Sequence, residues 1–322
     1  MGYLTRPAAA ADRPGVLALF PSAFGAGADP EEWRWKYDRN PFQAASIVAV
    51  EGERVLGFYG GFATRYRGAE GSLPGVSAVD VMTDPDARSL GHRNVFRQIG
   101  ETYARANAAL GIPFYFGFPN ERHRHVGERL IGYRPVEPAG ERARSIPAAG
   151  FVGRLRRRLF RVRVNERFGR SHESLAEILH ARGGWRTDRS AATMSWRFFE
   201  RPNVAYQVVE LRSLAGRSRG FAAVRIVSDR ALLVDLQLAD ESSGDLGDLL
   251  DAVSVSIAGG PARTLEVRSP STLLLARRLT GEMGFVERAS DCHFEVRPLD
   301  PGFDLERAAR SFDYRFSDHD VF

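Results

Sequence analysis

The two halves of the chain repeat one ordered series of short motifs. The segment "WRW" at 33–35 matches "WRF" at 196–198, and a Gly-Phe pair follows at the same spacing in both halves, beginning at Gly57 and at Gly220. An ordered series is hard to obtain by chance, so we interpret the chain as two copies of one unit. The further matched positions are Asp80 with Asp235, Pro119 with Pro270 and Gly132 with Gly284.

The first copy alternates predicted strands with predicted helices, which indicates an α/β fold with mixed sheets. Its expected strands are 3–8, 47–50, 55–63, 76–82, 112–118 and 133–138, and its main expected helices are 94–110 and 121–131. We expect an N-terminal domain at 1–145, an arginine-rich linker at 146–170, a C-terminal domain at 171–300 and a tail at 301–322.

Length and composition agree with two soluble domains. The chain has 322 residues, and domains typically have about 100–200. No stretch approaches the roughly 20 consecutive apolar residues of a membrane span, and charged residues interrupt the first 16 positions where a signal peptide would be apolar. The single cysteine, Cys292, forms no internal disulfide, so we expect a cytoplasmic protein.

The chain is basic, with a net charge of +5 and a pI of about 9.6, which invites phosphate-bearing partners. Arginines crowd the segment "GRLRRRLFRVRVNERFGR" at 153–170, which could lie on a membrane surface or bind nucleic acid. We favour the alternative, an inter-domain helix with solvated side chains. Nucleic acid, membranes and metals are therefore not expected as partners.

A strand, a basic glycine-containing turn and a helix follow one another between residues 76 and 110. The turn reads "RSLGHR" at 88–93, and "GFPN" at 117–120 leads into a short helix and "LIGYRPV". These motifs resemble the Gcn5-related N-acetyltransferase superfamily, whose turn has the form Arg/Gln-x-x-Gly-x-Gly/Ala. The likeness covers about residues 3–137 and is weaker in the second copy. The segments "WRWKYDRNPF" and "YRFSDHDVF" further resemble a subgroup associated with polysaccharide-related gene clusters.

The resemblance implies acetyl-CoA, or another acyl-CoA, as the cofactor. Backbone N–H groups at a helix N-terminus bind anions, glycine lets a phosphate approach, and Arg88 adds a charge-assisted contact. Arg93 departs from the signature, and we interpret it as a second cation. The expected cofactor contacts are Val81, Met82, Thr83, Arg88, Ser89, Leu90, Gly91, His92, Arg93 and Asn120.

The corresponding turn of the second copy is acidic. It reads "LADESSGDLGDLL" at 238–250, with carboxylates at Asp240, Glu241, Asp245 and Asp248. Like charges there would repel phosphates. We therefore expect the second cofactor site to be degenerate, and this copy to help shape the acceptor pocket.

Acyl transfer to an amine benefits from general acid–base groups. The superfamily often carries a carboxylate or a water-holding group where Asp80 stands, although a structural carboxylate is the alternative. Asn120 matches a position that often contacts the cofactor or an ordered water. The alternative is that Asn120 only caps the N-terminus of the following helix. Glu128 stands where the superfamily often has a tyrosine acid. His123 and His125 lie nearby, and histidine is a common general acid or base. The alternative is that both are solvent-exposed helix residues without a role in catalysis.

The aromatic-rich tail is the other place where chemistry is expected. We hypothesise that it packs against the first copy and places Asp318 and Asp320 near a cationic acceptor amine. His319 or the terminal carboxylate would then act as base, and a docked tail without chemistry is the alternative. Trp33 and Trp35 could stack on a sugar ring as substrate-binding residues, although aromatic residues are more often core.

The leading functional hypothesis is an acyl-CoA-dependent N-acyltransferase that acts on a small amine, such as an amino sugar or a sugar nucleotide. Two alternatives stay open. An aminoacyl-tRNA-dependent transferase of the tandem type would suit the basic linker, and its tRNA binding would depend on salt. A non-catalytic acyl-CoA-binding or other ligand-binding module would suit the departures at Arg93 and Glu128.

Overall fold

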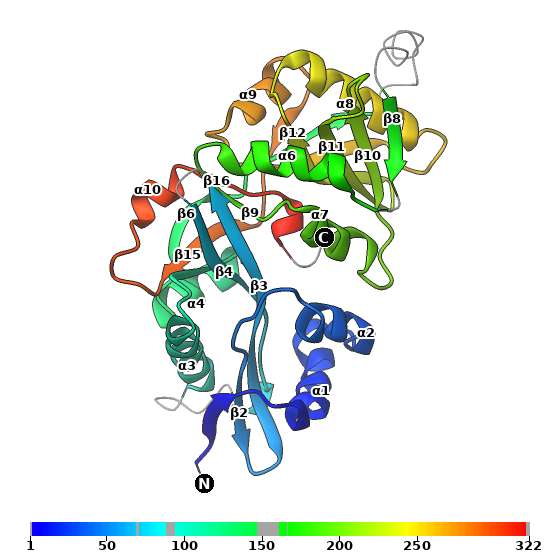
Figure 1. The fold of residues 1–322 in the computed structure, drawn as a ribbon. Helices are drawn as coiled ribbons and strands as arrows, with labels where there is room; N and C mark the ends of the chain where they lie inside the picture. The colour runs from blue at the N-terminus through cyan, green and yellow to red at the C-terminus, as the bar shows by residue number, and fades with distance from the viewer. Residues whose placement is uncertain (1, 69–70, 88–93, 147–160, 166, 320–322) are drawn as a thin grey trace. The chain divides into compact units, whose positions relative to one another are not determined.

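A computed structural model describes residues 2–68, 71–87, 94–146, 161–165 and 167–319 (Figure 1). Contacts between residues divide the chain into two compact units. The first comprises Met1–Arg65, Leu73–Glu137 and Cys292–Leu305, and the second comprises Tyr66–Ser72, Pro138–Asp291 and Glu306–Phe322. Each unit is built on a mixed sheet, which confirms the predicted fold class of two tandem α/β units.

The first unit follows the predicted order of strands and helices. Its helical elements are η1 (Ala10–Asp12), α1 (Arg13–Phe24), α2 (Pro30–Trp33), η2 (Arg34–Asp38), η3 (Pro85–Ala87), α3 (Val95–Ala109) and α4 (Glu121–Leu130). Its strands are β1 (Leu4–Pro7), β2 (Ile47–Glu51), β3 (Arg54–Gly68), β4 (Gly71–Thr83), β5 (Phe114–Gly117), β6 (Arg134–Pro138) and β15 (His293–Pro298). They pair in the order β1-β2-β3-β4-β5-β15-β6.

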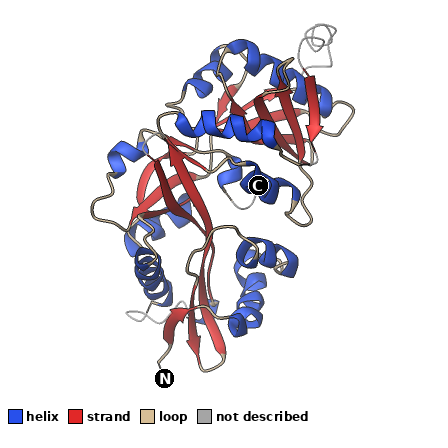
Figure 2. Cartoon of the chain, viewed as in Figure 1, coloured by secondary structure: helices blue, strands red, loops and turns tan. Residues whose placement is uncertain are grey.

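Two hydrophobic clusters cover the two faces of this sheet, because successive side chains of a strand point to opposite faces. In β2, Ile47 and Ala49 join Ile99 of α3, whereas Val48 joins Val16 of α1 and other residues of the second cluster. Helices therefore lie on both faces of the sheet (Figure 2).

The second unit repeats this plan. Its helical elements are α6 (Arg170–Ala181), α7 (Ala191–Phe199), α8 (Ser243–Ser256), α9 (Leu274–Gly281), α10 (Leu305–Ala309) and η5 (Phe316–Asp318). Its strands are β7 (Glu141–Ser145), β8 (Arg161–Asn165), β9 (Trp185–Thr187), β10 (Gln207–Arg212), β11 (Ser218–Val227), β12 (Arg230–Leu238), β13 (Thr264–Arg268), β14 (Val286–Arg288) and β16 (Phe312–Asp313). The main order is β14-β7-β13-β12-β11-β10-β8, while β9 pairs with β16 and with the end of β3.

The two copies exchange one strand each. β15 follows the second copy in sequence but inserts between β5 and β6 of the first sheet, and β7 follows the first copy but inserts between β13 and β14 of the second. Residues 292–305 therefore belong to the first unit and 306–322 to the second, whereas the domain boundaries expected from the sequence lie at 145, 170 and 300. Local hydrophobic pattern does not specify which sheet a short strand completes.

The arginine-rich segment departs from the expected helix in its described part. Residues 161–165 form the strand β8, which pairs antiparallel with β10 at the edge of the second sheet. Residues 147–160 lie outside the described residues. In the part of the chain that is described, no helix is long and apolar enough to cross a membrane.

Candidate functional site

The parallel strands β4 and β5 of the first unit form a fork. They pair at Val76 with Tyr115 and at Ser77 with Phe116, and the described register ends there. Three residues further, Asp80 has a φ of 53°, in the left-handed region. Asp tolerates that region better than most residues, so β4 turns away from an extended path just beyond its last pair with β5.

Asp80 is held by two side chains from a turn of π-helix, η2. Lys36 Nζ lies 3.0 Å from Asp80 Oδ2, and the Tyr37 hydroxyl donates a hydrogen bond of 2.6 Å to the same oxygen. The side chains of Lys36 and Asp80 are 8% and 10% exposed, so the ion pair is largely shielded from water. Left-handed non-glycine residues and π-turns both concentrate at functional sites. We call these three residues the Asp80 cluster.

Sequence reasoning found Asp80 but missed Lys36 and Tyr37. The available signal was that Lys36 is the only lysine in a chain whose other strong bases are arginines. Gly60 of β3 makes room for this arrangement. A Cβ atom there would collide with the Tyr37 hydroxyl and would lie 2.8 Å from the carbonyl oxygen of Val79.

Tyrosines occupy the opposite face of the fork, on the side of α3 and α4. The hydroxyls of Tyr59 and Tyr133 lie 3.0 Å apart, and a Cβ atom placed on Gly117 would lie 3.7 Å from the Tyr133 hydroxyl. Burial raises the pKa values of Tyr133 and Tyr59 well above the usual value of a phenol, so both keep their protons at neutral pH. Proton-bearing groups therefore flank the fork on both faces of the sheet.

A cavity of about 620 Å³ lies along α4 in the same unit. Both carboxylate and apolar groups line it, which suits a ligand with polar and apolar parts. Arg124, beside this cavity, donates a hydrogen bond of 2.6 Å to Glu128. The lining residues are His125, Val126, Glu128, Arg129 and Leu130.

Asn120 and His123 lie at the start of α4. The Asn120 side chain accepts a hydrogen bond of 3.0 Å from the N–H of His123, which confirms the helix N-cap interpretation. Both residues are exposed. A cofactor or water contact of Asn120 and a proton-transfer role of His123 stay predictions.

The expected cofactor contacts fall into two groups. The side chain of Met82 is buried in the hydrophobic cluster beneath α1 and α2, and that of Val81 packs against the cluster on the α3 side. Cofactor contacts with Val81, Met82 and Thr83 would therefore be made by main-chain groups, and they stay predictions. The whole expected pyrophosphate turn, Arg88, Ser89, Leu90, Gly91, His92 and Arg93, lies outside the described residues.

Trp33 and Trp35 belong to the core, which corrects the sugar-stacking interpretation. Trp35 has no exposed surface and packs 5.7 Å from the ring of Phe62. Trp33 is 9% exposed and its ring lies 4.4 Å from that of Tyr37. Trp33 therefore supports the Asp80 cluster by packing rather than by holding a substrate.

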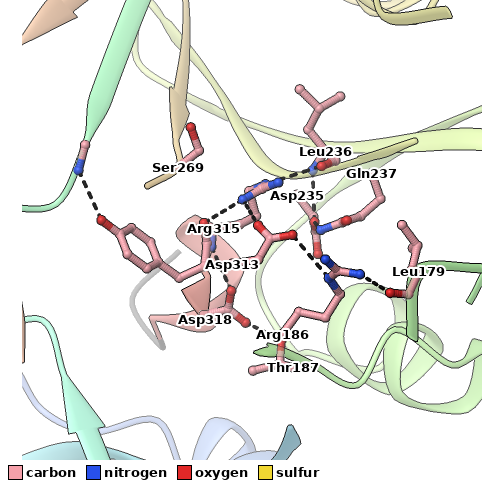
Figure 3. A network of polar contacts seen from close by, with 12 residues as sticks. Leu179, Arg186, Thr187, Asp235, Leu236, Gln237, Ser269, Asp313, Arg315 and Asp318 are labelled. Carbon is pink, nitrogen blue, oxygen red and sulfur yellow. Dashed lines mark hydrogen bonds and ion pairs between the residues drawn. The ribbon is translucent and has the colours of Figure 1, made fainter. Parts of the chain in front are cut away.

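The tail belongs to the second unit, which also includes the end of β3, where the ring of Tyr66 lies 5.5 Å from that of Phe312. Packing of the tail against the rest of the first copy stays a prediction. Phe316 joins the core between the second sheet and α6 and α7. Asp318 is buried, and its carboxylate lies 3.1 Å from Arg189. The same carboxylate accepts a hydrogen bond of 2.7 Å from the backbone N–H of Arg315 (Figure 3). Its charge is thus already compensated inside the protein, which argues against a role in holding an acceptor amine.

His319 and Asp320 end the described part of the tail. The His319 ring lies 3.4 Å from the guanidinium of Arg268, and its carbonyl oxygen accepts a hydrogen bond from Arg197. Asp320 and the terminal carboxylate lie outside the described residues. A role of His319 as general base stays a prediction.

The tail covers β12, the strand of the second unit that corresponds to β4. Arg315 donates to the carbonyl oxygen of Leu236, and Ser317 donates to Asp235, the residue matched to Asp80. The parallel register of β12 with β13 ends at Leu233, so the tail lies where the fork of this unit begins. This supports the prediction of a degenerate second cofactor site.

The acidic turn of the second unit has partners of its own. Asp245 forms an ion pair of 2.7 Å with Arg219, and Glu241 one of 3.4 Å with Arg182. Asp245 is buried in the first turn of α8. A buried carboxylate at this helix start disfavours a phosphate there.

Comparison with known proteins supports the fold. Neither a family model nor a curated protein matches the sequence. Among solved structures, a Gcn5-related N-acetyltransferase from Anabaena variabilis ATCC 29413 is 12% identical with a TM-score of 0.67, covering 93% of this chain and 73% of that one.

Two further solved structures share this fold. A Gcn5-related N-acetyltransferase from Kribbella flavida is 14% identical with a TM-score of 0.61, covering 93% and 72%. A tandem protein of this type from the clavulanic acid biosynthesis pathway is 13% identical with a TM-score of 0.59, covering 94% of this chain and 100% of that one. The chain therefore has the tandem fold of the Gcn5-related N-acetyltransferases.

Proposed function

We propose that this protein is an acyl-CoA-dependent N-acyltransferase that acylates the amine of a small molecule, such as an amino sugar or a sugar nucleotide. The observation that carries the proposal is the Asp80 cluster at the fork of the first unit. It places an oriented carboxylate at the point where β4 leaves β5, within a fold shared with N-acetyltransferases.

The first unit fits an acyl-CoA in the described part of the fork. Beyond Ser77 the main chain of β4 is released from its register with β5, so its N–H and C=O groups can pair with an extended polar ligand. Acyl-CoA supplies an acyl group that is activated as a thioester. The basic turn at 88–93 would hold the pyrophosphate, as its sequence predicts.

Asp80 would remove the proton that an attacking ammonium or amine must lose. A general base must lie within hydrogen-bond reach of that proton and must be oriented. Lys36 and Tyr37 fix both the position and the ionised form of Asp80, because each interacts with Oδ2. The Oδ1 atom lies further from Lys36, at 3.3 Å, and is the oxygen we assign to the substrate proton.

Calorimetric titration with acetyl-CoA tests the proposal first. We expect one-to-one binding by the wild type, and a loss of at least ~10-fold in affinity in the variant Arg88→Ala with Gly91→Glu, because a charged contact is removed and a carboxylate is introduced. The matched control is Arg97→Ala, which removes an exposed arginine of α3 that pairs with Glu101.

Two outcomes would contradict the proposal. Failure of the wild type to bind acetyl-CoA would remove it, and tRNA would be the next ligand to test at two salt concentrations. Equal loss of affinity in Arg97→Ala would show that general positive charge, rather than the predicted turn, holds the ligand.

A further inference from the structure

The candidate site of the first unit contains an amine of its own. Lys36 is the only lysine of the chain, and its Nζ atom lies 3.0 Å from Oδ2 and 3.3 Å from Oδ1 of Asp80. A substrate amine that gives its proton to Asp80 must come within a similar distance of that carboxylate. Lys36 therefore already has, toward the proposed base, the position that a substrate amine has to reach.

The π-turn η2 directs two successive side chains to this carboxylate. Neighbouring residues of an α-helix project about 100° apart, so they do not normally face one partner. In η2, however, the Lys36 ammonium and the Tyr37 hydroxyl both lie within hydrogen-bond distance of Asp80 Oδ2. The side chain of Lys36 is only 8% exposed, so reagents in bulk water reach it poorly.

The choice of lysine at this position is not explained by the ion pair alone. Every other strong base of the chain is an arginine. A guanidinium also pairs with a carboxylate, often through two hydrogen bonds, and it stays charged in proteins. What lysine adds is an amine that can lose its proton and act as a nucleophile, above all next to a base. The one lysine of the chain thus stands where that property can be used.

We propose that Lys36 is a site of self-acylation, at which the protein transfers an acyl group from acyl-CoA to its own Nζ atom when no substrate amine is bound. The proposal rests on the proposed function, because Asp80 serves as the base for Lys36 as it does for a substrate. The product is an amide, so the modification is stable and is not a step of the transfer to substrate.

The step balances without a further reactant. Asp80 takes one proton from the Lys36 ammonium, and the neutral amine attacks the acyl carbon of the thioester. A C–N bond forms and the C–S bond breaks with its electron pair on sulfur. The second proton that nitrogen loses on becoming an amide passes to sulfur through solvent, which gives the free thiol of CoA. Acylation removes the positive charge that Lys36 presents to Asp80.

Mass spectrometry of the full chain after incubation with acetyl-CoA tests the proposal. The chain offers only two amino groups, Lys36 and the N-terminal α-amino group, so peptide mapping assigns an added acetyl group without ambiguity. We expect one acetyl group per chain, on Lys36. Unmodified protein, or a label on the α-amino group alone, would overturn the proposal.

A second acetyl donor separates transfer at the site from chemical acetylation in solution. S-acetyl-N-acetylcysteamine has the same reactive thioester but lacks the nucleotide of CoA. At equal concentration it should label Lys36 at least ~10-fold more slowly, because it is not held at the site. Equal rates with the two donors would mean that Lys36 is merely reactive, which contradicts self-acylation.

Two carboxylate variants test the part played by the base. Asp80→Asn should label Lys36 about 10²-fold more slowly than the wild type with acetyl-CoA, as for loss of a general base. The matched control is Asp38→Asn, which changes a 41% exposed carboxylate of the same turn that pairs with Arg13 and should leave the rate unchanged. Equal rates in Asp80→Asn and the wild type would show that Asp80 does not activate Lys36.

Calorimetric titration of the same wild-type sample with CoA separates this proposal from the proposed function. Binding of CoA without acetylation of Lys36 would overturn self-acylation and leave the proposed function standing. Absence of CoA binding would overturn both.

Discussion

The variant Asp80→Asn should lose acyl transfer by about 10²–10⁴-fold in kcat, while it keeps its affinity for acetyl-CoA. Asn is the suitable replacement because it tolerates the left-handed backbone of this position, where φ is 53°. The amide oxygen of Asn can still accept the hydrogen bond from the Tyr37 hydroxyl, but the amide cannot act as a base. The measurement is kcat for acetyl-CoA and an amine, alongside calorimetric titration with acetyl-CoA.

A double variant distinguishes the loss of catalysis from the loss of stability. Asp80→Asn alone leaves the ammonium of Lys36 largely buried beside a neutral group, which should cost about 1–3 kcal/mol of unfolding free energy. Lys36→Met with Asp80→Asn removes that charge and should recover stability without recovering turnover. Recovery of turnover in the double variant would show that Asp80 has only a structural role.

The sequence repeat predicted the two units because its matching positions are specified by local structure. Gly132 and Gly284 follow α4 and α9 with φ of 85° and 70°, in the left-handed region that favours glycine at a helix end. Such positions are set by a few neighbouring residues. They can therefore be recognised in a single sequence, as can the alternation of strands with helices.

The exchange of β7 and β15 was not predictable in the same way. Each is a strand of only five or six residues, and the sheet that it joins is set by pairing between distant segments, such as Glu295 with Gly117. The candidate site shows the same limit. Asp80 was found through a family resemblance, but Lys36 lies 44 residues away along the chain and meets it only in the folded unit.

Arg189→Met should be the most destabilising single substitution considered for the second unit, with a loss of about 3–5 kcal/mol in unfolding free energy. Arg189 is 1% exposed and lies 2.9 Å from Asp235 and 3.1 Å from Asp318. Burial opposes its charge, but Asp235 and Asp318 outweigh that effect and raise the pKa of Arg189. Its removal leaves two buried carboxylates without their shared cation.

The same substitution should also release the tail, because Asp318 and Ser317 hold it to the second sheet through Arg189 and Asp235. Denaturant unfolding and limited proteolysis near the C-terminus would measure the two effects together. Arg230→Met is the matched control, since its pair with Glu266 is 45% exposed on the arginine side and should contribute less than about 1 kcal/mol.

Neutralising Asp235 and Asp318 shows whether Arg189→Met is destabilised by unpaired buried charge or by lost packing. Arg189→Met with Asp235→Asn and Asp318→Asn should regain part of the lost unfolding free energy, because neither former partner of Arg189 stays charged, while Arg186 and Arg315 keep their ion pairs with Asp313. If the triple variant is as unstable as Arg189→Met alone, the guanidinium contributes mainly by filling space. The tail would then be held by Phe316 in the core rather than by its ion pairs.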